Sequence, residues 1–415
     1  MTFYRLTQWM TWFLASFFYA YQYVLRVIPR VLMPDIMQKF QIDAAQFGQF
    51  SGLYYLGYVL MHIPLGILLD RVGPKIILPL CIGMTTLGLL PLIYADFWLY
   101  PGVGRILIGM GSSGAILGVF KIIRMNFKED HFTRMLGISV AIGLIGGIYG
   151  GWPIHKLREH LGLEQVLFLL IAIGGILALL FFILIPSLKS GSKASKKTLF
   201  SDIKSVLGNK KLLSICLLGG LMVGPLEGFA DVWGSSFLLH YYDFTKEIAS
   251  ALPDCIFFGM LVGSPLLSYV ADKTKAYYSL IILCAFGMAF DFIFLLMGLG
   301  TVFTLSLVFW SIGVLCAYQI LVIYKATTYV KSNLLGLSTA IANMIIMPFG
   351  YVYHTAIGEI MNFFGENRSA VGDIGGYGKD AFVAAISLIP LGLFIGGFGF
   401  IIIVLSERKR KFRNV

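Results

Sequence analysis

Long apolar runs alternate with short polar segments along the whole chain of 415 residues. A helix needs about 20 apolar residues to cross a bilayer, so runs of that length indicate membrane spans. Twelve such runs lie at about residues 9–32, 45–69, 76–95, 98–123, 134–155, 165–186, 212–240, 249–271, 277–298, 302–325, 335–358 and 381–405. The pattern therefore predicts an all-α integral membrane protein with twelve transmembrane helices.

Composition supports this class. Hydrophobic residues make up 58% of the chain and charged residues 13%, with a mean hydropathy of +0.84. A soluble protein of this length could not bury so much apolar surface. The five cysteines all lie within apolar runs and lack CxxC spacing, which favours small buried hydrophobes over disulfides or a metal site. We expect no metal and no other cofactor.

A polar segment divides the predicted spans into two sets of six. KSGSKASKKT, at residues 189–198, is basic and serine-rich and has no apolar face. We therefore expect an N-terminal six-helix bundle at residues 1–187, a basic cytoplasmic linker at 188–211, and a C-terminal six-helix bundle at 212–415 that ends in a basic cytoplasmic tail.

The net charge of +11 could indicate a nucleic-acid partner, but its distribution indicates topology instead. If both termini are cytoplasmic, most of the 32 basic residues fall on the cytoplasmic side of the membrane. That asymmetry follows the positive-inside rule. We therefore predict cytoplasmic termini and no nucleic-acid binding.

The segment that follows the second predicted span recurs in degenerate form after the eighth. In the first copy, GILLDRVGPK, the relevant residues are Gly66, Asp70, Arg71, Gly73 and Lys75. The second copy, SYVADKT, contains Asp272 and Lys273, and both copies place a small residue four positions before an acid that a base follows. Such a repeat is typical of transporters built from two related halves.

These features resemble the major facilitator superfamily. Its signature after the second helix is Gly-x-x-x-Asp-Arg-x-Gly-x-Lys/Arg, and a second motif, Arg-x-x-x-Gly-x-Gly-x-x-Gly, is matched by RILIGMGSSG from Arg105 to Gly114. The resemblance spans the whole chain. It implies two pseudo-symmetric six-helix bundles and a non-enzymatic secondary transporter that works by alternating access. We expect a monomer whose partners are the lipid bilayer, protons and a small-molecule substrate.

A finer resemblance concerns the substrate. The pattern YxYxxRVxP in the first span, followed by DAAQFGQFSGLYYLGYVLMHIPLGILLDR, is similar to importers of organic anions and to phagosomal nutrient transporters of intracellular bacteria. It implies a bacterial cytoplasmic (inner) membrane location. In the fifth span, GLIGGIYGGWP lacks the Gly-Pro pair of family exchangers, which weakens the case for a drug exporter. We interpret its glycines as packing against the neighbouring half.

The first span carries a polar stripe. At 100° per residue its members project within about 60° of one direction; they are Tyr19, Gln22, Tyr23, Arg26 and Arg30. A guanidinium inside a membrane is costly unless it faces water, an acid or an anion, so Arg26 is a substrate-binding candidate, with a structural ion pair as the alternative. Arg30 is expected to reach water at the membrane surface. We expect the stripe to line the transport pathway.

The seventh span supplies acids. In GPLEGFADVW, Glu227 and Asp231 are four residues apart and face the same way, and Pro225 leaves room for a kink. We predict that Glu227 couples transport to protons or contacts substrate. Asp231 is a candidate for the same coupling or for an outer gate. Arg105 fits either a role in proton transfer or a structural role, and both stay open.

The remaining candidates are gates and neutral contacts. Asp70, Arg71, Gly73, Lys75, Asp272 and Lys273 form the predicted gating set, in which Asp70 pairs with a helix end or a base across the two halves; a topological anchor is the alternative. Polar contacts to substrate are expected from Tyr58, Tyr318, Gln319 and Asn343. His62 is a lone histidine, and we expect it to be packed and hydrogen-bonded.

The function predicted from these residues is proton-coupled import of a small organic anion, such as a citrate-like polycarboxylate, alone or as its iron or other metal chelate. A proton-coupled importer of amino acids or nucleosides is the alternative. A nutrient receptor of the same fold, which binds ligand without transporting it, is the alternative from a different class. No ATP-binding, hydrolase or metalloprotease motif stands in a plausible setting, so an enzyme is not predicted.

Overall fold

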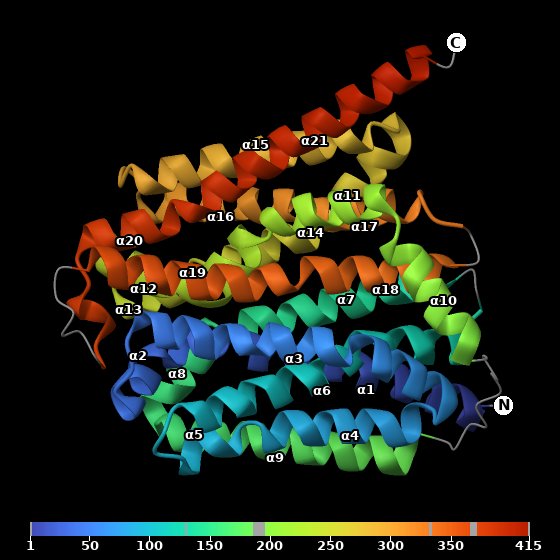
Figure 1. The fold of residues 1–415 in the computed structure, drawn as a ribbon. Helices are drawn as coiled ribbons and strands as arrows, with labels where there is room; N and C mark the ends of the chain where they lie inside the picture. The colour runs from blue at the N-terminus through green and yellow to red at the C-terminus, as the bar shows by residue number, and fades with distance from the viewer. Residues whose placement is uncertain (1, 129–130, 186–195, 332–333, 366–371, 414–415) are drawn as a thin grey trace. The chain divides into compact units, whose positions relative to one another are not determined.

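A computed structural model describes residues 2–128, 131–185, 196–331, 334–365 and 372–413 of the protein. Every regular element among these residues is a helix, so the predicted all-α fold is confirmed (Figure 1). Most of the predicted linker sequence KSGSKASKKT lies outside the described residues, and the chain is helical again from Lys196. Four of the five cysteines are buried free thiols, and Cys255 is half-buried.

The chain forms two compact units. Unit 1 holds residues 1–194 and 367–376, and unit 2 holds residues 195–366 and 377–415. The short segment at residues 367–376 comes late in the sequence but belongs to unit 1, and it contains η4 (Ile374–Gly376). It is held by a hydrogen bond of 3.1 Å from the backbone N–H of Gly372 to the carbonyl oxygen of Ile42.

Unit 1 is built from the first helices of the chain. In order they are α1 (Thr2–Val27), α2 (Pro29–Phe40), α3 (Ala44–Arg71), α4 (Pro74–Leu87), α5 (Leu90–Tyr94), α6 (Leu99–Asn126), α7 (Phe132–Tyr149), α8 (Trp152–Leu161) and α9 (Leu163–Leu184). Helix α6 packs against both α3 and α4, and α1 packs against α6 and α7 (Figure 1). The polar stripe of α1 is therefore carried by a helix at the centre of the unit's packing.

Unit 2 contains the remaining helices. In order they are α10 (Lys196–Leu207), α11 (Lys210–Leu221), η2 (Gly224–Trp233), α12 (Gly234–Tyr241), α13 (Lys246–Ala251), α14 (Asp254–Thr274), α15 (Tyr277–Leu296), α16 (Val302–Cys316), α17 (Tyr318–Thr327), α18 (Leu335–Ile346), α19 (Pro348–Phe364), α20 (Lys379–Ile386) and α21 (Leu388–Arg413). Several of these are consecutive pieces of one span, such as α11, η2 and α12, which together cover Lys210–Tyr241.

Ten helical stretches among the described residues are long and apolar enough to cross a membrane. An eleventh is the bent pair formed by Arg134–Tyr149 and Trp152–Leu161, whose axes differ by 42°. Twelve spans were predicted, and the one that does not meet this criterion is the first, α1. Its mean hydropathy is lowered by the polar stripe, which includes Gln22 and Arg26. A spanning helix that faces a polar interior is expected to show this weakness.

Helix α1 ends early because of a proline. The sequence predicted a span to residue 32, but α1 stops at Val27 and α2 begins at Pro29. Proline has no backbone N–H, so the carbonyl of Leu25, four residues earlier, loses its helical partner. The break therefore exposes backbone acceptors at the end of α1, beside Arg26.

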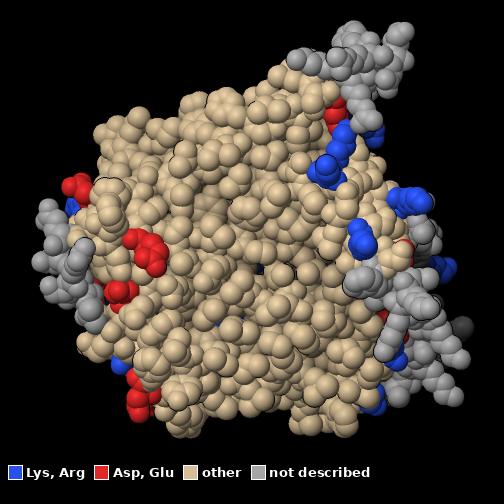
Figure 2. All heavy atoms as spheres, viewed as in Figure 1, with Lys and Arg blue, Asp and Glu red and all other residues tan. Residues whose placement is uncertain are grey.

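Charged side chains lie at the ends of the helices. In Figure 2, the Lys, Arg, Asp and Glu side chains gather near the ends of the helices, and other residues form the surface between them. Exposed apolar side chains include Ile183 and Phe290, each 63% exposed. Soluble monomers rarely expose large apolar patches, whereas a lipid-facing surface requires them.

Glycines let the helices of unit 1 approach closely. A Cβ atom on Gly146 of α7 would lie 2.1 Å from the carbonyl oxygen of Ala20 on α1, and one on Gly109 of α6 would lie 1.9 Å from that of Tyr54 on α3. The glycine-rich segment of α7 therefore packs on α1 of its own unit, whereas we had interpreted it as packing against the other half. Gly109 brings the Tyr54 face of α3 against the arginine motif of α6.

We expect Gly146→Ala to destabilise the protein, because the added methyl group would overlap a backbone oxygen that cannot move alone. Overpacking of this kind costs about 1–3 kcal/mol. Gly137→Ala, on the same helix, is the matched control, since nothing lies within 4 Å of its Cβ position. Thermal unfolding in detergent measures both. A Gly146→Ala midpoint no lower than that of Gly137→Ala would contradict this packing of α1 and α7.

The seventh predicted span is not a simple kinked α-helix. After Pro225 the hydrogen-bond ladder changes to the π pattern over Gly224–Trp233, and the N–H of Gly234 donates to the carbonyl of Phe229, five residues earlier. The proline explains the loss of the α pattern. Stretches of π-helix are often found at functional sites, and this one carries Glu227 and Asp231.

Candidate functional site

Arg26 lies in the last turn of α1 and is buried, with 6% of its surface exposed. Its guanidinium carbon lies 5.3 Å from the ring centroid of Tyr23 and 5.4 Å from that of Tyr55 on α3. Each cation–π contact stabilises the charge by about 0.5–2 kcal/mol, which is less than full hydration would supply. The two tyrosine rings therefore help to hold the guanidinium in place.

The neighbouring polar side chains are positioned by direct contacts. The Tyr54 hydroxyl donates a hydrogen bond of 2.7 Å to Oε1 of Gln22, and both side chains are buried. The rings of Tyr19 and Tyr23 meet edge to face at 5.3 Å. Four members of the predicted stripe, Tyr19, Gln22, Tyr23 and Arg26, thus share one environment on α1. Their positions agree with the helical spacing of the sequence. Their role in substrate binding stays a prediction.

Arg30 is placed differently from expectation. We predicted that it would reach water at the membrane surface, but it is 2% exposed and lies on α2, beyond the break after Val27. The prediction was wrong because it placed Arg30 at the membrane surface, whereas packing within the unit buries its side chain.

Arg105 clamps the end of α1. Its Nη1 donates to the Leu25 carbonyl at 2.7 Å, and its Nη2 lies 3.3 Å from the Arg26 carbonyl and 3.4 Å from the Ser51 carbonyl. The guanidinium also lies over the ring of Tyr54, at 5.2 Å. Nη1 of Arg105 therefore meets the Leu25 carbonyl, which Pro29 leaves without its helical partner. This geometry favours the structural alternative for Arg105, and its part in proton transfer stays a prediction.

We expect Arg105→Lys to lower the thermal midpoint while leaving the number of protons moved per substrate unchanged. A lysine ammonium is a point charge without the planar fork that reaches several carbonyls at once. Thermal unfolding and coupled flux measurements on the same preparation separate the two effects. A variant with an unchanged midpoint and lost coupling would instead assign Arg105 to proton transfer.

In unit 2, Glu227 is 1% exposed within the π-helix. Nε2 of Gln319 on α17 lies 3.4 Å and 3.5 Å from its two carboxyl oxygens, and His354 of α19 contacts its backbone carbonyl through Nε2 at 2.5 Å. The structure thus brings together Glu227 and Gln319, which the sequence nominated separately. The amide of Gln319 thus lies beside both oxygens of the Glu227 carboxyl group, and the role of Glu227 in proton coupling stays a prediction.

The other unit 2 candidates differ in their surroundings. Asp231 is fully buried on the same π-helix. Tyr318 is also fully buried and donates a hydrogen bond of 2.9 Å to the Gly219 carbonyl, a contact between helices α17 and α11 that fits a packing role. Asn343 on α18 is half-buried.

The predicted gating residues lie at helix ends. Oδ1 of Asp70 accepts a hydrogen bond of 2.7 Å from Nζ of Lys121 on α6, so its partner here belongs to unit 1. Gly73 adopts φ +93°, which L side chains rarely adopt, and it precedes α4. In the second copy of the motif, Oδ1 of Asp272 accepts a hydrogen bond of 2.9 Å from the Tyr277 hydroxyl. Arg71 and Lys273 are exposed and Lys75 is half-buried.

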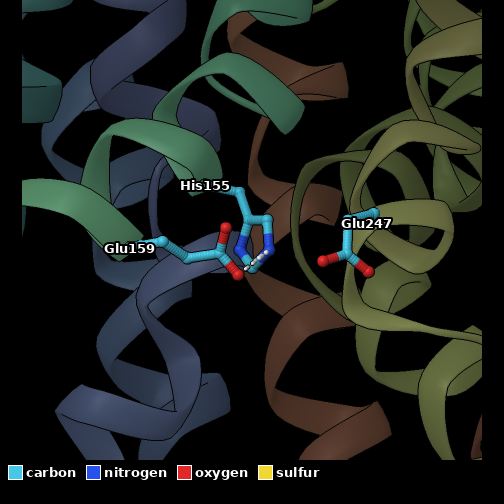
Figure 3. A group of neighbouring side chains, drawn as sticks. All are labelled: His155, Glu159 and Glu247. Carbon is cyan, nitrogen blue, oxygen red and sulfur yellow. Dashed lines mark ion pairs between the residues drawn. The ribbon is translucent and has the colours of Figure 1, made fainter.

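Sequence reasoning missed a charged cluster on α8. Figure 3 shows His155 and Glu159 one turn apart on this helix, with Nε2 of His155 3.3 Å from Oε1 of Glu159. Arg158 of the same helix forms a two-pronged ion pair with Asp35 of α2, with both contacts at 2.5 Å. The i, i+4 spacing of His155 and Glu159 could have predicted the first pair. The ion pair between Arg158 and Asp35 joins residues that are far apart in the sequence, so no local sequence pattern predicts it.

Comparisons with known proteins agree with the fold. The family model described as Major Facilitator Superfamily matches residues 12–353. NicT of Pseudomonas putida is 29% identical over 181 residues, which is 40% of each chain. The transporter YybO of Bacillus subtilis is 26% identical over 339 residues, 74% of this chain and 76% of that protein. The human lysosomal dipeptide transporter MFSD1 is 24% identical over 271 residues, 59% of this chain and 57% of that protein. The alignments with NicT and MFSD1 thus span less than two thirds of those proteins.

Solved structures share the architecture over nearly the whole chain. A bacterial homologue of the human lysosomal transporter Spinster, in an inward-facing and unoccupied conformation, has a TM-score of 0.71 at 16% identity and covers 95% of this chain and 97% of that one. The nucleoside transporter NupG has a TM-score of 0.74 at 14% identity and covers 94% of this chain and 98% of that one. These likenesses show the fold alone. Because the family model matches most of its length, the protein belongs to the Major Facilitator Superfamily. It is therefore a multi-pass secondary transporter rather than an enzyme.

Proposed function

We propose that the protein imports a small organic anion together with protons. The single observation that carries the proposal is Arg26, a guanidinium that is 6% exposed and lies against two tyrosine rings. A cationic side chain within a membrane span costs roughly 2.5–3.5 kcal/mol on insertion scales, and such residues mark substrate pathways. Its planar donors match a carboxylate in a two-pronged geometry.

Glu227 is the proposed proton carrier. It is buried on a π-helix of unit 2, and the nearby Gln319 amide can donate to its ionised form. A carboxyl group in such surroundings binds a proton when it faces a dry environment and releases it when water enters. Movement of the anion together with one or more protons would let an inward proton gradient drive its accumulation.

The remaining roles follow from positions at the helix ends. We assign Asp70 and Asp272, with the basic residues beside them, to gates that open and close during alternating access. The contact between Asp70 and Lys121 is surface-exposed and therefore weak, which suits a contact that breaks in each cycle. We further propose two six-helix domains joined by the basic segment at residues 188–211, both termini in the cytoplasm of a bacterial cell, and a monomeric carrier in its inner membrane.

The substrate class has two alternatives. From the sequence we expect a citrate-like polycarboxylate, alone or as its metal chelate. An amino acid, which would place its carboxylate on Arg26, is the first alternative. Similarity to a dipeptide transporter and to a nucleoside transporter is the reason to test zwitterionic and neutral substrates beside the anions. A receptor that binds ligand without accumulating it is the remaining alternative.

Uptake into proteoliposomes tests the proposal. Radiolabelled carboxylates, metal–citrate chelates, amino acids and nucleosides are offered in pools, with and without an inward proton gradient. The expected result is gradient-driven accumulation of an anion. Accumulation of a neutral nucleoside alone would support the second alternative, and binding without accumulation would support the receptor.

A further inference from the structure

A series of aromatic side chains in contact with one another extends from Arg26 along helices α1 and α3. The Arg26 guanidinium contacts Tyr23 and Tyr55, and Tyr19 meets Tyr23 ring to ring at 5.3 Å. Tyr54 of α3, which donates a hydrogen bond to Gln22 of α1, has its ring 6.2 Å from that of Tyr58. The series therefore continues from α1 onto α3 within unit 1.

On α3 the series ends at His62. Its imidazole stacks on the Tyr58 ring, with centroids 5.2 Å apart and planes inclined by 24°. Tyr58 and His62 are four residues apart, so they share one helix face. Tyr55, which contacts Arg26, precedes His62 by seven residues, and a rise of 1.5 Å per residue places them about 10 Å apart along the helix.

His62 is not the satisfied histidine that the sequence led us to expect. It is 3% exposed, and within the described part of the chain its Nδ1 atom is buried without a hydrogen-bond partner. A buried polar atom in this state costs free energy, and such atoms call for an explanation in a ligand or in ordered water. Its stacking on Tyr58 fixes the plane in which a partner must lie.

We propose that His62 is a substrate-binding residue and that the substrate is a carboxylate with a planar ring, bound with its carboxylate on Arg26 and a polar ring substituent on Nδ1 of His62. This inference rests on the proposed anion transport and narrows it. The face formed by Tyr19, Tyr23, Tyr55, Tyr58 and His62 offers flat apolar surfaces and one guanidinium. A ring packs well on such surfaces, whereas a compact polycarboxylate would require further cations.

The probes are four labelled acids: 4-hydroxybenzoate, benzoate, cyclohexanecarboxylate and citrate. Binding of each is measured to the full chain in lipid nanodiscs. We expect 4-hydroxybenzoate to bind best, with a loss of about tenfold when its hydroxyl is absent, the size of one hydrogen bond. We expect a further loss for cyclohexanecarboxylate, whose ring is not flat.

Two substitutions assign these preferences to residues. His62→Phe keeps the stacked ring and removes the nitrogen, so it should abolish the difference between 4-hydroxybenzoate and benzoate while benzoate binding is retained. Tyr58→Leu should instead reduce the preference for flat over puckered rings, and it provides an independent test if His62→Phe does not fold.

Three outcomes would overturn the inference. They are an unchanged hydroxyl preference in His62→Phe, an unchanged ring preference in Tyr58→Leu, and tighter binding of citrate than of any ring acid. If citrate bound more tightly than every ring acid and Arg26→Ala abolished its binding, this inference would fall and the proposed anion transport would stand. If no acid bound in a manner that depends on Arg26, both would fall.

Discussion

Arg26→Ala is expected to reduce anion uptake by about 100-fold or more. A two-pronged pair between guanidinium and carboxylate contains two charge-assisted hydrogen bonds, each worth roughly 1.5–3 kcal/mol in a buried site, and about 1.4 kcal/mol corresponds to a factor of ten. Alanine also leaves the substrate charge without a partner. Arg26→Lys keeps the charge but loses the fork, so an intermediate loss is expected. Initial uptake rates over a range of substrate concentrations provide the measurement.

A matched control separates this effect from a general loss of positive charge. Arg124, at the end of α6 in the same unit, is exposed and lies against the ring of Phe132. Arg124→Gln removes the same charge and should leave uptake within about twofold of the wild type, since exposed charges contribute little. Equal losses in Arg124→Gln and Arg26→Ala, or normal uptake in Arg26→Ala, would remove Arg26 from the substrate site.

Glu227→Gln is expected to abolish accumulation driven by the proton gradient while exchange of labelled for unlabelled substrate continues. Glutamine has nearly the same shape and keeps the packing of the π-helix, but it cannot carry a proton. The measurement compares uptake under an inward proton gradient with exchange at equal pH on both sides of the membrane. The expected loss is complete for the first and small for the second.

Asp291→Asn provides the control for Glu227. Asp291 is a half-buried acid on α15, and its Oδ2 lacks a hydrogen-bond partner among the residues that the structure describes. If proton coupling depended on every carboxyl group within the membrane spans, Asp291→Asn would lose accumulation as well. We expect it to retain gradient-driven uptake. Loss of accumulation in Asp291→Asn with normal accumulation in Glu227→Gln would reverse the assignment.

The sequence predicted what depends on local pattern. Apolar runs of sufficient length gave the all-helical membrane fold, and helical spacing grouped Gln22 and Arg26 on one face, where the structure has them buried near each other. The same polarity explains why α1 fails a hydropathy criterion that ten other stretches meet. The hydropathy criterion therefore misses the span that carries Arg26, the proposed substrate-binding residue.

What the sequence did not predict depends on contacts between distant segments. Pro29 could be read as a helix breaker, but nothing local indicated that Arg105, some 80 residues later, would cap the Leu25 carbonyl that it frees. The pairing of Asp70 with Lys121 likewise joins two helices. Pro225 indicated a disturbed helix but not a π pattern, because the register of hydrogen bonds is set by packing around η2. The sequence also gave no sign that Nδ1 of His62 would lack a hydrogen-bond partner among the residues that the structure describes.

The central claim is that an anion bound at Arg26 moves together with protons. Its most direct test follows both fluxes at once in proteoliposomes, with a pH-sensitive dye inside the vesicles and labelled anion outside, at zero membrane potential. We expect that addition of the anion acidifies the interior of wild-type vesicles, and that Arg26→Ala abolishes both anion entry and acidification. Anion entry without acidification, or acidification that persists in Arg26→Ala, would contradict it.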